Sequence, residues 1–267
     1  MTVGTVILIL FAAGLLLCAG VAAYAFILMK KQPPEAWYEG RAKQEDFIPL
    51  SGIPARQAAL MVELEDKEFY QHRGVFPGEI RAAARMNFRA KTIVYGGSTI
   101  TMQLAKNLYF RFTRNYLRKA AEIIIALALE RKLGKERILE LYLNIIYFGN
   151  GVYGISDAAR FYFSKPVTAL SLNQMFLLAC IPPAPTRGNP VQYPEVFERI
   201  RNRRLNVLLR ERKYWLITQD EAAEIFAHGP DCLDPELRKP DDFTRAYPQT
   251  IPLVNERFGR YGGRPRA

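Results

Sequence analysis

The sequence has few of the side chains that most often carry zinc or disulfide chemistry. It contains two histidines, His72 and His228, and three widely spaced cysteines without a CxxC pair. Histidines so far apart disfavour the common His/Cys zinc sites and a Ser-His-Asp triad, and the cysteines do not form a disulfide framework. Any catalysis by this chain must therefore depend on carboxylates and cations.

Charged side chains are absent from the beginning of the sequence. No Asp, Glu, Lys or Arg precedes Lys30, although the whole chain carries 37 Lys+Arg and 26 Asp+Glu. The apolar run from Val3 to Met29 exceeds the roughly 20 residues that a helix needs to cross a bilayer. It also lacks the basic start and the short apolar core of a cleaved signal peptide. We therefore expect a retained transmembrane anchor over residues 1–31.

The charges that flank this anchor bear on its orientation. Lys30 and Lys31 follow the apolar run directly, and the positive-inside rule places such residues in the cytoplasm. Taken alone, the charge pattern therefore argues weakly against an exported domain.

Helical patterns dominate the rest of the chain, and strand-like alternation is nearly absent, which predicts a mainly α fold. Residues 32–53 are expected to be a juxtamembrane linker, because Pro33-Pro34 does not continue a helix. A single domain is predicted over 54–228, followed by a Pro-rich tail over 229–267 that lies on the surface or is partly disordered. Gly134 is expected to separate two helices. The predicted helices are Ala55–Asp66, Gly78–Ala90, Thr99–Phe110, Tyr116–Leu133, Lys135–Tyr147, Ile155–Phe163, Ser171–Cys180, Pro194–Tyr214 and Thr218–His228.

Carboxylates crowd the end of the first predicted helix of the domain. Glu63, Glu65 and Asp66 lie where the helix dipole disfavours negative charge, so a raised pKa is expected there. A carboxylate with a raised pKa suits a general base. The alternative interpretation is a solvated acidic helix end.

A glycine-rich turn leads into the helix that starts near residue 99. Ser98 is placed to cap this helix, and Thr99, Gln103 and Lys106 follow at helical spacing on one face. This polar and cationic face predicts an anion site. A capped surface helix would explain the same pattern.

Cations and aromatic residues alternate over residues 109–119, where Arg114, Arg118 and Lys119 occur. This composition suits either a phospholipid interface or nucleic acid. The anchor favours the membrane, and no nucleic-acid partner is expected.

Glu122 follows Arg118 by four residues, so it is either a simple ion-pair partner or a second acid that faces Glu65.

A further basic cluster occupies the helix expected over Pro194–Tyr214. We interpret it as peripheral, with apolar residues that cover the core and cations that face anionic headgroups. Its members are Arg199, Arg201, Arg203, Arg204, Arg210, Arg212 and Lys213.

Taken in order, these segments resemble the bacterial peptidoglycan glycosyltransferases, the domain that class A penicillin-binding proteins share with monofunctional enzymes. The likeness covers about residues 55–210. Its main motifs are Glu65-Asp66-x-x-Phe69-x-x-His72-x-Gly74, Gly97-Ser98-Thr99-Ile100-Thr101-x-Gln103-Leu104-x-Lys106-Asn107, Arg118-Lys119-x-x-Glu122, Lys135-x-x-Ile138-Leu139-Glu140-x-Tyr142-Leu143-Asn144 and Phe148-Gly149-x-Gly151-x-Tyr153-Gly154-Ile155.

The resemblance implies a lysozyme-like, two-lobed helical domain that polymerises lipid II into β-1,4-linked glycan. The reaction would proceed with inversion and release polyprenyl pyrophosphate. The implied location is the inner membrane, crossed once, with the domain on the periplasmic face, which overrides the weaker charge argument. The expected partners are lipid II, the growing glycan strand, membrane phospholipid and proteins of cell-wall synthesis or division. The chemistry of the leaving pyrophosphate calls for neutralisation of its charge by Lys, Arg or a divalent cation, Mg or Mn, and no other cofactor is expected.

The resemblance also implies roles for individual residues. Glu65 would take the proton from the 4-hydroxyl of the acceptor sugar, and Glu122 would be the second acidic residue of the cleft. Lys106 and Arg114 would hold the lipid pyrophosphate. Met102 stands where the family usually has glutamine, a change expected to alter a contact without abolishing activity. The remaining substrate-binding candidates are Ser98, Thr99, Gln103, Asn107, Arg118 and Lys119.

Other activities remain to be weighed against this one. Serine transpeptidases use Ser-x-x-Lys, and none of the serines here has lysine three residues later, which favours a monofunctional enzyme. A lytic enzyme that cuts glycan with Glu65 as its acid is one rival hypothesis. A non-catalytic, membrane-tethered protein that binds an anionic polymer is the other.

Overall fold

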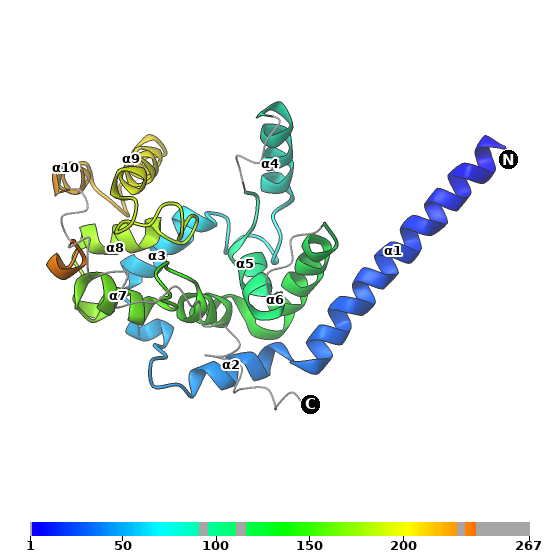
Figure 1. Cartoon of the computed structure of the whole chain (residues 1–267), viewed down its shortest axis with the longest axis horizontal. Coiled ribbons are helices and arrows are strands. Elements are labelled where there is room, and N and C mark those ends of the chain that lie inside the picture. The colour runs from blue at the N-terminus through cyan, green and yellow to red at the C-terminus, as the bar shows by residue number, and fades with distance from the viewer. Residues whose placement is uncertain (1, 91–95, 111–115, 229–232, 239–267) are drawn as a thin grey trace.

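The computed structural model describes residues 2–90, 96–110, 116–228 and 233–238 (Figure 1). Over these residues the protein is helical, as the sequence predicted, and contains no β-strand. A single isolated bridge between Tyr147 and Tyr153 is the only strand-like pairing in the described residues. The expectation of a mainly α fold is therefore confirmed.

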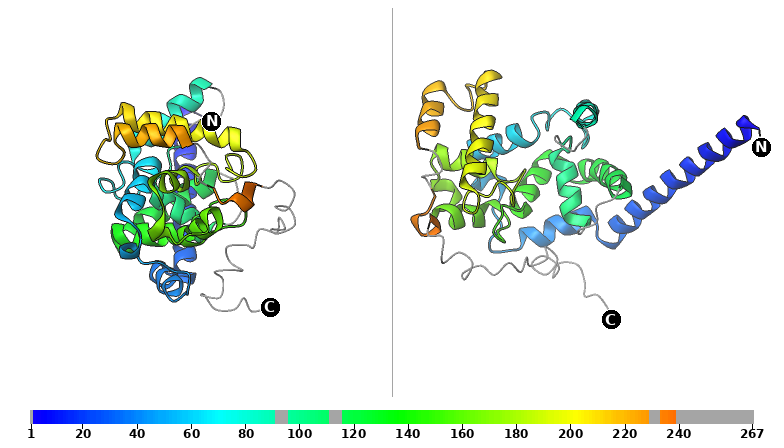
Figure 2. Two further views of the ribbon diagram at one scale, coloured as in Figure 1. Left: turned by 90° about the vertical axis from the view of Figure 1, so that its left-hand side faces the viewer. Right: turned by 45° about the horizontal axis from the view of Figure 1, so that its top comes forward.

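The N-terminal helix α1 (Val3–Lys31) projects away from the body of the molecule (Figures 1 and 2). Only Val21 and Ala25 of this helix are buried, against the long helix α6, and the other described apolar side chains of α1 are mostly exposed. An exposed apolar helix of this length is long enough to cross a membrane. This agrees with the anchor expected from the sequence.

The segment expected to be a linker instead forms a helix, α2 (Pro34–Ala42), which lies along α6. Pro33 is extended and Pro34 is the first helical residue, a position where the missing amide hydrogen of proline costs nothing. Two prolines therefore start a helix here rather than interrupting one. Trp37 and Arg41 are buried, and Arg41 pairs with Asp46, so this segment is packed against the domain.

The remaining helices gather around two central ones, in agreement with the expected two lobes. Helices α1, α2 and α5 pack on α6, whereas α3, α9 and α10 pack on α8 or one another, and α7 contacts both α6 and α8. Helix α4 stands apart from α9 across the molecule (Figure 1). The bounds are α3 Ala55–Glu65, α4 Pro77–Ala90, α5 Ile100–Tyr109, α6 Tyr116–Ile145, α7 Ile155–Phe163, α8 Leu172–Cys180, α9 Pro194–Arg210 and α10 Gln219–His228, with 3-10 turns at Leu50–Gly52, Val167–Ala169 and Pro235–Arg238.

The helix boundaries agree with the sequence expectation at one point and differ from it at two others. Gly134 interrupts α6 with φ 73°, as predicted. The N-cap of α5 is Thr99 rather than Ser98, because the Thr99 side chain accepts the amide hydrogen of Met102. Helix α9 ends at Arg210 rather than Tyr214, because Arg212 adopts φ 55° and the amide of Lys213 bonds back to the carbonyl of Leu208.

The described part of the C-terminal tail returns to α7. Leu233 is buried, the amide of Asp234 donates to the carbonyl of Tyr162, and Ser164 donates to the Asp234 carboxylate. This short piece therefore packs on the domain. The rest of the expected tail, 229–232 and 239–267, lies outside the described residues.

Gly74 fixes the loop between α3 and α4 against α6. Its φ is +91°, and a Cβ there would lie 2.8 Å from the backbone oxygen of Ala126. Its own carbonyl accepts a hydrogen bond of 2.6 Å from the Thr99 hydroxyl. Only glycine allows both the backbone conformation and the close approach, so the loop sits at a set distance from α5 and α6.

Replacing Gly74 with alanine is expected to destabilise the fold by about 2–5 kcal/mol, because backbone strain and a steric clash add. Gly151→Ala is the matched control: Gly151 has φ +76° but no atom within 4 Å of its hypothetical Cβ. The control should lose only about 1–2 kcal/mol of strain energy. Thermal unfolding of both variants in detergent measures the difference. Equal losses would show that the contact with α6 contributes nothing.

Candidate active site

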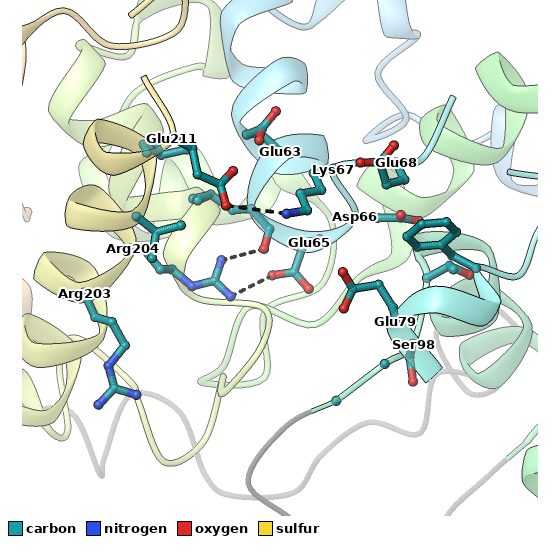
Figure 3. Close-up of a pocket in the computed structure, with 17 residues that line it drawn as sticks. Glu63, Glu65, Asp66, Lys67, Glu68, Glu79, Ser98, Arg203, Arg204 and Glu211 are labelled. Carbon is teal, nitrogen blue, oxygen red and sulfur yellow. Dashed lines mark hydrogen bonds and ion pairs between the residues drawn. The ribbon is translucent and has the colours of Figure 1, made fainter. Parts of the chain in front are cut away.

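A pocket of about 280 Å³ opens beside the end of α3 (Figure 3). Its walls come from the loop after α3, from α4, from the turn before α5 and from α9. Carboxylates dominate its charged lining, although three cations are also present. The charged lining residues are Glu63, Glu65, Asp66, Lys67, Glu68, Glu79, Arg203, Arg204 and Glu211.

Glu65, the last residue of α3, is one of the carboxylates in this pocket that the sequence singled out. Its side chain is 5% exposed. One oxygen, Oε2, accepts a hydrogen bond of 3.0 Å from the Gln103 amide, and the other, Oε1, lies 3.2 Å from Nη2 of Arg204. The carboxylate is therefore held at both oxygens by donors from two different helices.

The environment of Glu65 makes its carboxylate more basic than an ordinary glutamate. Burial raises the pKa of Glu65, Arg204 and Gln103 oppose this shift, and the charge of Asp66 adds to it. The direction agrees with the sequence expectation. The main cause is burial, however, rather than the helix dipole on which that expectation rested.

Asp66, next to Glu65, ties the end of α3 to the start of α5. Its carboxylate accepts from Nε2 of His72 at 2.9 Å and from the amide of Ile100 at 2.9 Å. The amide of Gly74 donates to Nδ1 of His72 at 3.0 Å, so the ring proton resides on Nε2. These hydrogen bonds link the end of α3 to the loop after it and to the start of α5.

The polar face of α5 predicted from the sequence lies against Glu65, but its residues differ in what they do. Thr99 is buried and holds the loop at Gly74. Gln103 reaches Glu65, and its Oε1 accepts from the Tyr142 hydroxyl at 3.3 Å, so its amide group points its hydrogens toward Glu65. Met102 is fully buried.

A cluster of cations surrounds Glu122 at the start of α6. Glu122 is 1% exposed, and its two oxygens pair with Arg118 and with Lys119, the latter at 3.2 Å. Lys119 also donates to Ser98 at 2.7 Å. Because Ser98 lines the pocket, this bond connects the cation cluster to the site of Glu65.

Lys106 of α5 interacts electrostatically with both of these centres. Loss of hydration lowers the pKa of Lys106, the charges of Glu122 and Glu65 raise it, and Arg118 and Lys119 lower it. The ammonium group of Lys106 therefore interacts electrostatically with the carboxylates of Glu122 and Glu65 and with the cations of Arg118 and Lys119. An anion entering here would relieve the repulsion among three neighbouring positive charges.

The structure thus brings most of the predicted site residues together. Glu65, Ser98 and Thr99 line the pocket, Gln103 contacts Glu65, and the cations gather around Glu122. Nδ2 of Asn107 is buried without a hydrogen-bond partner in the part of the chain that the structure describes. Arg114 lies outside the described residues.

The described residues do not form a protein-built metal site. They contain no group of three or more His, Cys, Asp or Glu side chains arranged to hold an ion. The carboxylate nearest the cation cluster, Glu122, already has both oxygens paired. The divalent cation expected at the pyrophosphate stays a prediction, and no chemical step is assigned to it.

The basic helix α9 is not peripheral, contrary to the sequence interpretation. Arg201 is completely buried and bonds to the carbonyl of Ile225, and Arg204 reaches Glu65. The sequence does contain a pattern that places Arg201 on the buried side of α9. Arg201 falls four residues after Phe197 and four before Leu205, and both of these residues are buried. Cations on the apolar stripe of a helix point inward.

Comparison with known proteins agrees with this geometry. A family model described as Transglycosylase matches residues 32–211. The chain is 43% identical over 178 residues to penicillin-binding protein 1A of Aquifex aeolicus, covering 67% of this chain and 24% of the relative. It is 37% identical over 213 residues to penicillin-binding protein 4 of Bacillus subtilis, covering 79% of this chain and 32% of the relative.

A shorter relative aligns over most of its own length. It is a protein of Cupriavidus necator named as a candidate transglycosylase, 38% identical over 177 residues, covering 66% of this chain and 74% of the relative. The chain belongs to the transglycosylase family, the peptidoglycan glycosyltransferase domain that class A penicillin-binding proteins share. It spans about a quarter to a third of the two penicillin-binding relatives compared above.

Proposed function

We propose that the protein is a membrane-anchored glycosyltransferase that polymerises lipid II into β-1,4-linked glycan strands. The observation that carries this proposal is the position of Glu65: a buried, basic carboxylate in a pocket, with a cation cluster beside it. Family membership supports the reaction class.

The proposed reaction needs one proton acceptor. The 4-hydroxyl oxygen of the acceptor sugar attacks C1 of the donor sugar, and its proton passes to the Glu65 carboxylate. The bond from C1 to the pyrophosphate oxygen breaks, and that oxygen keeps the electron pair. Attack opposite an α-linked leaving group gives a β linkage, hence inversion. A raised pKa makes Glu65 a better proton acceptor for this step.

The leaving pyrophosphate needs neutralisation of its charge more than protonation. Lys106, Arg118 and Lys119 supply positive charge from two helices. We assign to Glu122 the task of holding Arg118 and Lys119 in place, because each of its two oxygens pairs with one of these cations. Fixed cations of this kind stabilise the charge that develops as the bond breaks.

The proposed location rests on α1 and on the substrate. An apolar helix that leaves the domain close to the cation cluster would hold the site near the membrane surface, where the polyprenyl chain resides. We propose a single crossing of the inner membrane, with the domain on the periplasmic face. Phospholipid and the growing strand are then immediate neighbours, and proteins of cell-wall synthesis or division are proposed partners.

The substrate class is tested by incubating the purified full chain in detergent with lipid-linked disaccharide-peptide, and separately with preformed glycan. We expect polymer from the lipid-linked monomer and no cleavage of the preformed glycan. Cleavage of glycan without polymerisation would establish the lytic enzyme instead. Binding of glycan without either reaction would support the non-catalytic protein.

A further inference from the structure

We infer that Arg204 of α9 is a positioning residue for the proposed base: it fixes one oxygen of Glu65 and keeps the buried carboxylate ionised. This inference rests on the proposed function, which it deepens by assigning a task to a helix outside the cation cluster. The sequence motifs that suggested the site did not include Arg204.

The guanidinium of Arg204 makes two contacts with the same stretch of α3. Nη2 lies 3.2 Å from Oε1 of Glu65, and Nη1 donates to the carbonyl of Leu64 at 3.2 Å (Figure 3). One planar group therefore grips both the side chain of Glu65 and the backbone before it. Such a two-point contact fixes the direction of the carboxylate, which a flexible ammonium would not do as well.

Both side chains of the Glu65–Arg204 pair are mostly shielded from water. The side chain of Glu65 is 5% exposed and that of Arg204 is 20% exposed. Burial alone would favour the protonated acid, which cannot accept a proton from a sugar hydroxyl. Among the neighbours that oppose the effect of burial on the pKa of Glu65, the charge of Arg204 has the largest influence.

Other groups around Glu65 do not replace this charge. The neighbouring carboxylate of Asp66 raises the pKa of Glu65, whereas Gln103 lowers it without carrying a charge. Lys106 of α5 is near enough to interact with Glu65, but it belongs to the proposed pyrophosphate site. The further titratable groups nearby are Tyr142 of α6, Cys180 of α8 and the pocket-lining Glu63, Lys67, Glu68, Glu79, Arg203 and Glu211.

The pH dependence of polymerisation tests this role. Removing the charge in Arg204→Gln should move the acidic limb of kcat/KM to higher pH by at least about one pH unit. Activity should then recover partly as the pH is raised. Arg204→Lys, which keeps a cation but loses the two-point contact, is expected to move the limb by less and to lower kcat.

Arg203→Gln is the matched control. Arg203 lines the same pocket as Arg204, and the substitution removes one positive charge, as Arg204→Gln does. It should keep the wild-type midpoint. An equal shift in Arg203→Gln would mean that only the general charge of α9 matters. An unshifted limb with a uniform loss of rate in Arg204→Gln would reduce Arg204 to a structural residue. Either result overturns the inference.

A second measurement needs no substrate and separates this inference from the proposed function. The melting temperature of the full chain is compared with that of Glu65→Gln across pH, in the Arg204 and the Arg204→Gln backgrounds. Because folding raises the pKa of Glu65, its ionisation removes stability as the pH rises through the folded-state pKa.

In the Arg204→Gln background this loss should be larger and should continue to a higher pH. Identical curves in both backgrounds would refute the role of Arg204, even if the enzyme polymerises lipid II. Absence of polymer from the wild-type protein would refute the proposed function, while the stability curves would still decide the role of Arg204.

Discussion

Glu65→Gln is expected to lower the rate of polymer formation roughly a thousandfold, within the range that a general base contributes. Glutamine keeps the size of the side chain and can still accept a hydrogen bond through its carbonyl oxygen, but it cannot take the proton of the acceptor hydroxyl. The effect should appear in kcat. Initial rates with lipid-linked disaccharide-peptide, measured side by side for both proteins, give the ratio directly.

Glu68→Gln is the matched control for this substitution. Glu68 lines the same pocket, and the change removes one negative charge with the same geometry. It should retain activity within about threefold, because Glu68 is not placed to act as the base. Equal losses in the two variants would mean that the charge of the pocket, rather than one proton acceptor, drives the reaction.

Loss of activity in Glu65→Gln is not expected to reflect unfolding. Burial of an ionised carboxylate works against folding at neutral pH, and the neutral amide removes that disadvantage. The variant should therefore melt at the same temperature as the wild-type protein or higher. Such a gain in stability with a loss of function is typical of active sites.

Lys106→Met is expected to reduce kcat/KM by about two to three orders of magnitude, as removal of one preorganised charge-stabilising group does in other enzymes. Methionine keeps much of the length of the side chain and removes the ammonium that interacts electrostatically with both Glu122 and Glu65. Lys106→Arg should restore part of the activity, because it returns the charge with a different shape.

Lys132→Met provides the control for Lys106→Met. Lys132 pairs with Glu35 at the surface of the domain, where the two side chains are 47% and 40% exposed. Its replacement should leave the rate nearly unchanged, since exposed ion pairs contribute little. If Lys106→Met polymerised as fast as this control, the assignment of the leaving-group site to the cation cluster would be wrong.

The fold was largely predictable because helical periodicity extends over most of the domain, and Gly134 breaks α6 as expected. The segment after the anchor was not, because Pro33-Pro34 both ends one helix and suits the first position of the next. Its packing on α6 depends on contacts such as the bond from Tyr38 to Glu140, more than a hundred residues away. Sequence spacing does not show a contact of that kind.

Individual residues of the site were predictable from the sequence, whereas the contacts between residues of different helices were not. The motifs identified Glu65, Gln103 and Lys106, and local spacing suggested the pair of Glu122 with Arg118. Arg204 was misinterpreted because a run of cations resembles a solvated face unless each residue is compared with the apolar stripe of its helix. Tyr142 orients Gln103 from another helix, a relation that only the tertiary structure displays.

Binding of fluorescently labelled lipid-linked disaccharide-peptide to Glu65→Gln, measured in detergent beside its turnover, tests the central claim most directly. If Glu65 acts as the base, the variant binds this substrate with a Kd within about twofold of the wild-type value and forms almost no polymer. Loss of binding in step with turnover would instead make Glu65 a residue that holds the substrate, and the proposed mechanism would fail.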